Sequence, residues 1–188
     1  MRVQVQSQFA PLYRRLDQLS ERLRGQVVTR ALNRTGEAAR TVAVREISRT
    51  YNITAAKTRE RISVSKAFAA GRLAVTVEVR SRFGKRATNL ITFGARQLAR
   101  GGVSVKIRRD KPPLRGRAWF IVTNRKTGGT FVARRTGTAK GDIEPVRTVD
   151  VGQMFNSRAT RQAILARIRA VFPAEFARQF RLATQARR

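Results

Sequence analysis

The arginines and lysines are the side chains of this sequence whose binding chemistry is clearest. No acidic residue lies between Glu78 and Asp110 or between Asp110 and Asp142, although both intervals are rich in Lys and Arg. A guanidinium group offers planar N–H donors that match phosphate and carboxylate oxygens. We therefore expect this stretch to bind a polyanion or an acidic partner. The candidate residues are Arg80, Arg82, Lys85, Arg86, Lys106, Arg108, Arg109, Lys111, Arg115, Arg134, Arg135 and Lys140.

The acidic residues offer much less chemistry. Among the eleven acids, only Asp142 and Glu144 lie close together in a loop region. Such a pair can bind a divalent cation or transfer protons, but two acids on a glycine-containing loop are usually solvated or paired with arginine. The pairs Gly101-Gly102 and Gly128-Gly129 lack the spacing of phosphate-binding loops. They indicate hairpin turns instead.

The composition excludes many classes of enzyme. The 188 residues contain no cysteine and no histidine, which removes thiol nucleophiles, imidazole bases and most transition-metal sites. We expect no catalytic residue, no metal site and no cofactor. With 41 Lys and Arg against 11 Asp and Glu, the net charge is 41 − 11 = +30, so an anionic partner is expected in the working form.

No apolar run is long enough to cross a bilayer, and the N-terminus lacks the apolar core of a signal peptide. The expectation is a chain made in the cytoplasm, with no membrane contact.

The elements that must position these cations begin with helices. Apolar residues recur at intervals of three and four over 7–23 and again over 28–47, which predicts two amphipathic helices with a stop or kink at Gly25. The second helix has a face of small residues, which favours close packing in the core over packing between subunits. A short helix is expected over 53–62, with Asn52 or Thr54 as its N-cap.

The middle of the chain changes to a period of two. Residues 73–80 alternate between apolar and polar side chains and form the clearest predicted strand. Weaker strands are expected over 89–93, 103–109, 117–123, 129–135 and 146–149. In the second of these, Val103, Val105 and Ile107 would face one way while Ser104, Lys106 and Arg108 face the other. One face of the antiparallel sheet is therefore expected to be basic.

Two helices are predicted near the C-terminus, one capped by Asn156 or Ser157 and a final one that starts at Pro173. The order predicts a single α+β domain with N-terminal helices over 1–70, a central antiparallel sheet with basic loops over 71–149, and C-terminal helices over 150–188.

The order of these parts resembles that of a known protein family. The resemblance rests on residues 31–47 (ALNRTGEAARTVAVREI), 57–62 (KTRERI), 72–77 (RLAVTV), 119–121 (WFI), 144–147 (EPVR) and 172–180 (FPAEFARQF). In type and order they are similar to the prophage minor tail protein Z family, whose members are small and very basic.

This resemblance implies a structural, non-enzymatic virion protein of a long-tailed bacteriophage. It would act as a tail-completion or neck component at the head-proximal end of the tail, supporting head–tail joining and positioning of the genome end. The implied partners are the tail terminator and connector, with DNA or the tape-measure protein as possible contacts, in a homo-oligomeric ring expected to be a hexamer.

Composition alone also fits a second class, a ribosomal or nucleoid protein that binds the nucleic-acid backbone. Zinc-finger ligands, basic-zipper heptads and an RNA-binding aromatic motif are absent from the sequence, so contact would be with phosphates in either case.

Overall fold

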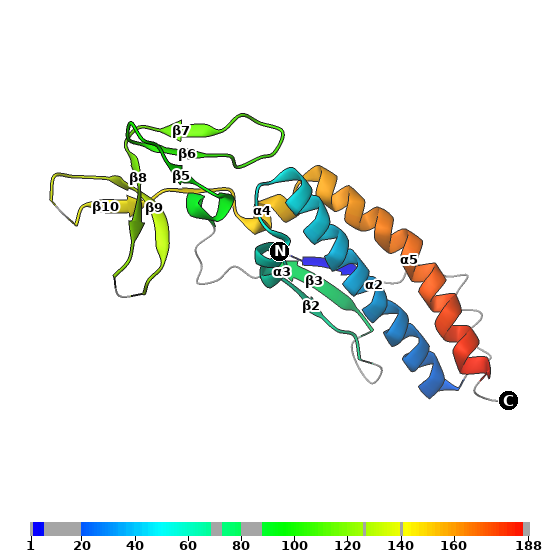
Figure 1. Ribbon diagram of the computed structural model, residues 1–188. Coiled ribbons are helices and arrows are strands. Elements are labelled where there is room, and N and C mark those ends of the chain that lie inside the picture. The colour runs from blue at the N-terminus through cyan, green and yellow to red at the C-terminus, as the bar shows by residue number, and fades with distance from the viewer. Residues whose placement is uncertain are drawn as a thin grey trace.

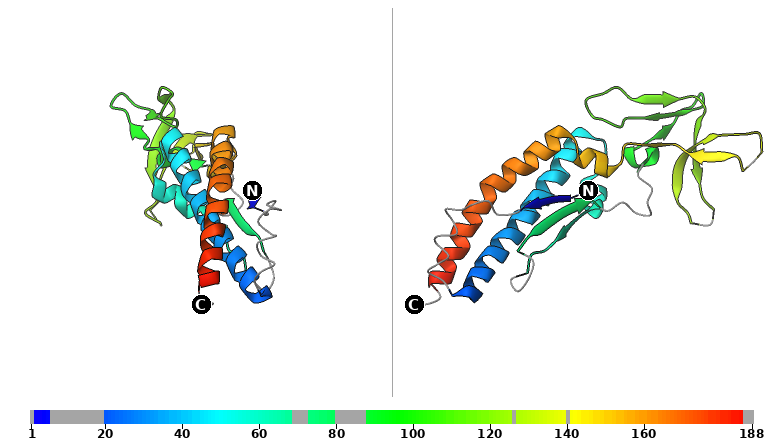
Figure 2. Two further views of the ribbon diagram at one scale, coloured as in Figure 1. Left: turned by 90° about the vertical axis from the view of Figure 1, so that its right-hand side faces the viewer. Right: turned by 180° about the vertical axis from the view of Figure 1, so that it is seen from behind.

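The computed structural model describes residues 2–5, 20–68, 73–79, 88–125, 127–139 and 141–185. They form an α+β fold, as predicted. Two long antiparallel helices, α2 (Glu21–Thr50) and α5 (Arg158–Gln185), lie side by side, and a β-rich part made of residues 88–125, 127–139 and 141–148 extends from one end of them (Figure 1). The right view in Figure 2 shows the same elongated arrangement from behind.

Helix α2 confirms the predicted helix over 28–47, and its small residues lie in the core. Ala31, Ala39 and Ala43 are fully buried, and α5 packs along α2. The predicted stop at Gly25 is wrong, because α2 runs through this residue. A glycine inside a helix costs only about 1 kcal/mol relative to alanine, and the burial of Val27 and Val28 directly after it outweighs that cost. The predicted helix over 7–23 lies mostly outside the described residues.

Helix α5 is one continuous helix, so the predicted start of a new helix at Pro173 is also wrong. Proline removes one N–H donor from the helix interior. Here Phe172 and Phe176 are buried on either side of it, with ring centres 6.1 Å apart. Their packing holds the helix together across the proline. At its start, the Ser157 hydroxyl accepts a hydrogen bond from Thr160 N, which confirms Ser157 as the cap.

A three-stranded antiparallel sheet packs on α2. Its order is β1 (Arg2–Val5), β3 (Val75–Val79) and β2 (Ile62–Ser65). Strand β3 confirms the clearest predicted strand. Strand β2 was not predicted; it follows directly after α3 (Ala55–Arg61), whose N-cap is Thr54. Gly36 of α2 lies so close to β3 that a Cβ atom there would lie 2.6 Å from Val75 Cγ2.

The β-rich part holds three further small antiparallel sheets where one central sheet was predicted. The first has the order β5 (Arg96–Gln97), β6 (Val103–Val105), β7 (Leu114–Gly116), and the second has the order β10 (Ile143–Pro145), β9 (Thr130–Arg135), β8 (Trp119–Thr123). The third pairs β11 (Arg147–Thr148) with β4 (Thr88–Asn89). Gly101-Gly102 and Gly128-Gly129 form the turns between β5 and β6 and between β8 and β9, as predicted.

The predicted strand over 89–93 is mostly wrong. Only Thr88–Asn89 form a strand, and Leu90–Phe93 form the 3₁₀ helix η2. The cause is local: the Asn89 side chain accepts a hydrogen bond from Ile91 N at 3.0 Å and so caps the turn. The turn then buries Leu90 and Phe93 together.

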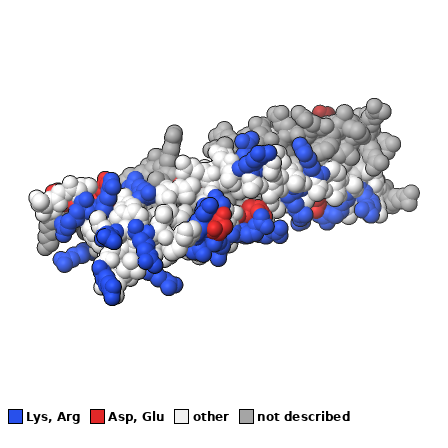
Figure 3. Space-filling view, turned by 90° about the horizontal axis from the view of Figure 1, so that it is seen from above, with Lys and Arg blue, Asp and Glu red and all other residues white. Residues whose placement is uncertain are grey.

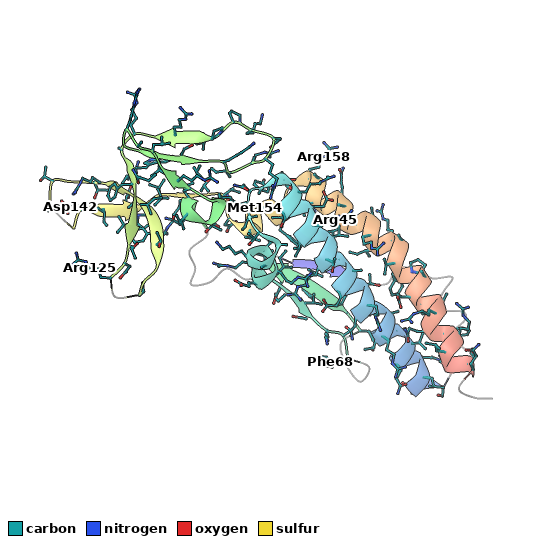
Figure 4. All side chains as sticks on the ribbon, viewed as in Figure 1. Arg45, Phe68, Arg125, Asp142, Met154 and Arg158 are labelled. Carbon is teal, nitrogen blue, oxygen red and sulfur yellow. The ribbon has the colours of Figure 1, made fainter. Side chains whose placement is uncertain are left out.

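The β-rich part joins the helices through both backbone and core contacts. Asn52 N donates to Ile107 O at 2.8 Å, and Arg109 N donates to Thr50 O at 2.9 Å. A short helix that was not predicted, α4 (Val151–Phe155), lies at the same junction and buries Met154 (Figure 4). Buried residues of the β-rich part and of the helices belong to one hydrophobic cluster.

Candidate polyanion-binding surface

Of the twelve predicted contact residues, seven lie in the described part of the chain. Arg80, Arg82, Lys85, Arg86 and Lys140 lie outside it. The remaining seven do not form one cluster; they divide into three groups that differ in what their side chains contact.

Arg108 and Arg109 hold the junction between the β-rich part and α2. Arg108 donates from Nε and Nη2 to the two carboxylate oxygens of Asp110, at 2.9 and 2.8 Å, and its guanidinium carbon lies 5.5 Å from the centre of the Tyr51 ring. The hydrogen bonds from Arg108 lower the pKa of Asp110 to about 2. Arg109 Nε donates to Ser48 O at 3.0 Å. Arg108, one of the predicted contact residues, therefore already has its charge paired with Asp110.

Arg134 and Arg135 follow each other on β9 and are also engaged. Arg134 pairs with Glu144 of β10. Arg135 lies with its guanidinium carbon 5.9 Å from the centre of the Phe120 ring. Both arginines stay exposed, so each keeps donors that face solvent.

Lys106, Lys111 and Arg115 form the third group. All three are exposed, and within the described part of the chain they make no ion pair. Their charges are available to an external anion.

The register of the β5–β6–β7 sheet places cations in a row. Ser104 of β6 pairs with Arg96 of β5 on one side and with Arg115 of β7 on the other. Directly paired residues point to the same face of a sheet. Because strands lie about 4.8 Å apart, Arg96 and Arg115 flank Ser104 with about 10 Å between their backbones. We call these three residues the basic row.

On the opposite face of this sheet, the central strand β6 belongs to the core, whereas Gln97 and Leu114, which pair with it, are exposed. Val103 and Val105 are 0% and 1% exposed. The predicted alternation is confirmed for Val103, Ser104 and Val105, where β6 ends; Lys106 and Arg108, the basic residues of the predicted outer face, lie beyond the strand. Arg96 lay within the acid-free stretch but was not among the predicted contact residues, and only strand pairing shows its place beside Arg115.

The cations are not confined to the β-rich part. Figure 3 shows Lys and Arg spread along the length of one face, over sheets and helices alike, with few acidic side chains among them. Helix α5 alone carries six arginines and one glutamate. The acid-free stretch is therefore one section of a longer basic surface.

The two neighbouring acids are each occupied by structural contacts. Asp142 accepts a hydrogen bond from Ala139 N at 3.1 Å, which closes the turn between β9 and β10, and Glu144 pairs with Arg134. Among the described residues, no group of three or more His, Cys, Asp or Glu side chains is arranged to hold a metal ion.

No helix in the described ranges is long and apolar enough to cross a membrane. Comparisons of this chain with protein-family models, with curated proteins and with solved structures each return no match.

Proposed function

We propose that this chain is a non-enzymatic structural subunit of a long-tailed bacteriophage, positioned at the head-proximal end of the tail. Made in the host cytoplasm, it joins the virion as a tail-completion or neck component and supports head–tail joining and genome-end positioning. The resemblance to the minor tail protein Z family gives the proposal its biological setting. The structure supports it with surfaces suited to binding and with acids engaged in structural contacts.

The basic row is the observation that carries the proposal. Arg96 and Arg115 lie on the outer face of the β5–β6–β7 sheet, on either side of a central strand whose Val103 and Val105 are buried on the other face. Strand pairing therefore fixes the backbone positions of both arginines. Neither has an acidic partner in the described part of the chain. Held in this way, they suit the phosphates of the genome or the carboxylates of a neck or tail protein.

Charge limits how the subunit assembles. A hexamer matching the symmetry of a tail would carry six times +30, or +180, from the formal charge of one chain. Self-repulsion of this size opposes ring closure unless an anionic partner offsets it. The proposal therefore includes a monomer in isolation and a ring that forms only with the terminator, the connector, DNA or the tape-measure protein.

The test is a deletion of the gene for this chain in the phage or prophage that encodes it, followed by electron microscopy of the lysate. The proposal predicts filled heads and finished tails that have not joined. Wild-type protein supplied in trans should restore joined virions, whereas the double variant Arg96→Glu/Arg115→Glu should not. A matched charge reversal on α5, Arg161→Glu/Arg169→Glu, controls for the loss of net charge. Infectious, joined virions in the absence of the chain would rule the proposal out.

A further inference from the structure

A second candidate binding site lies away from the basic row, beside the C-terminal half of α2. An open groove of about 580 Å³ runs between this part of α2 and the start of α3. Its exposed surface is mainly apolar and includes Ala55, while Val44, which also lines it, is only 3% exposed. Three arginines border the groove: Arg45 and Arg49 of α2 and Arg59 of α3. Arg45 lies in the second half of α2 (Figure 4).

Two of these arginines have no acidic partner. In the part of the chain that the structure describes, Arg45 and Arg59 form no ion pair and are exposed. Arg49 donates to Glu46 at 2.7 Å, yet its side chain remains 74% exposed, whereas that of Glu46 is 10% exposed. Arg45 and Arg49 are four residues apart, so they lie one above the other on the helix surface.

Two enclosed polar atoms, one in the lining of the groove and one on a residue bonded to Arg59, have no hydrogen-bond partner in the described structure. The Ser48 hydroxyl, which lines the groove, is enclosed and has no hydrogen-bond partner in the described structure. Arg40 Nε is likewise enclosed and unpaired, while its Nη2 donates to the carbonyl of Arg59 at 3.1 Å. Enclosed polar groups are nearly always hydrogen-bonded in folded proteins. Neither atom is exposed to the groove, so a ligand would contact the exposed arginines and the apolar surface instead.

We propose that this groove binds an acidic amphipathic segment of a partner protein. The carboxylates of the segment would pair with Arg45 and Arg59, and its apolar side chains would cover Ala55 and the other exposed apolar atoms of the groove. A peptide segment offers both kinds of group, whereas the sugar–phosphate backbone of a nucleic acid offers charge but little apolar surface, and its protein interfaces are mainly polar. The apolar surface between the arginines therefore favours a peptide. This inference does not depend on the proposed place in a phage tail.

Binding of a synthetic peptide tests the inference. The probe is a fluorescent helix-forming peptide of glutamate and leucine, with the leucines three and four residues apart. Its affinity for the full chain is measured by anisotropy. The variant Arg45→Ala/Arg59→Ala should bind it about tenfold more weakly, since two exposed ion pairs are lost. The variant Arg161→Ala/Arg169→Ala removes the same charge from α5 and should change the affinity less than about twofold.

A further variant blocks the groove without removing an arginine. Ala55 is exposed in the first turn of α3, where a glutamate is tolerated, so Ala55→Glu should keep the fold, as checked by circular dichroism, and abolish peptide binding. Equal losses of peptide affinity in the Arg45→Ala/Arg59→Ala and Arg161→Ala/Arg169→Ala variants would overturn the inference. Undiminished binding of a peptide with serine in place of leucine would also overturn it. Duplex DNA that competes as strongly as the peptide, and loses affinity only in the Arg45/Arg59 variant, would assign the groove to phosphates instead.

Discussion

Arg108 donates two hydrogen bonds, of 2.9 and 2.8 Å, to the carboxylate of Asp110, directly beside the Tyr51 ring at the end of α2. Tyr51 and Arg108 also form an antiparallel bridge between their backbones. The pair therefore stands where the β-rich part meets the helices. An arginine that the sequence places in a contact surface is used within the molecule to fix this junction.

The Arg108–Asp110 pair should make stability depend on pH in the acid range. Because the folded-state pKa of Asp110, about 2, is below its ordinary value of 3.8, the pair stabilises the fold fully above pH 3.8. The contribution is lost as pH falls from 3.8 toward 2. Thermal unfolding of the wild type and of Asp110→Asn should differ by a small amount at pH 6, since exposed pairs are screened. The difference should vanish near pH 2; a constant difference would contradict the assignment.

Asn89 should be a strong stabilising residue of the β-rich part. Its side chain accepts from Val132 N at 2.9 Å and donates to Val132 O at 3.0 Å, at the edge of β9 just beyond its pairing with β10. Asn89→Ala leaves the buried Val132 N–H without its acceptor, which should cost about 2 kcal/mol in urea unfolding. The exposed Gln162→Ala should change stability by less than about 0.5 kcal/mol. Equal stabilities of the two variants would show that the Asn89 contacts contribute little.

Gly36 should be required for the close approach of α2 and β3. Alanine is a better helix former than glycine by about 1 kcal/mol, but a Cβ at this position would clash with Val75, and overpacking costs about 1–3 kcal/mol. Gly36→Ala should therefore destabilise the protein, and Val75→Ala should relieve part of that loss in the double variant. Gly141, where an added Cβ would meet no heavy atom within 4 Å, is the control for the same substitution. A neutral Gly36→Ala would mean that the helix and strand separate easily.

Nucleic-acid binding separates the two function classes. If the cations bind phosphates only through charge, duplex DNA and duplex RNA of equal length should bind with similar affinity, and the logarithm of the binding constant should fall linearly with the logarithm of salt concentration. Arg96→Glu/Arg115→Glu should make this slope shallower. Tight selectivity for RNA that persists at moderate salt would instead favour a ribosomal or nucleoid protein.

The sequence predicted those elements whose signals are local. The β-branched alternation over 73–80 and the small-residue face of 28–47 both correspond to observed elements. The predicted helix stop at Gly25 and helix start at Pro173 were wrong because tertiary packing overrides the local preference of glycine and proline. The short helix α4 carries a complete capping box of Asp150 and Gln153. That spacing was available as a signal in the sequence.

The candidate surfaces depend on contacts that a linear pattern does not contain. Charge alone located the acid-free stretch, but the basic row exists only because strand register brings Arg96 and Arg115 to either side of Ser104. The groove combines arginines of two helices. The pairing of Arg108 had a local signal, since Asp110 is only two residues away, but hydrogen bonding depends on backbone geometry at that point.

The central claim, a place at the head-proximal end of a phage tail, is tested most directly by locating this chain in a cryo-electron microscopy reconstruction of the intact virion. We expect density for the paired helices α2 and α5 in a ring between the connector and the tail tube, with the basic row facing DNA or an acidic neighbour. Purified virions that lack the chain, or that hold it only in the capsid shell or the tail tip, would contradict the account.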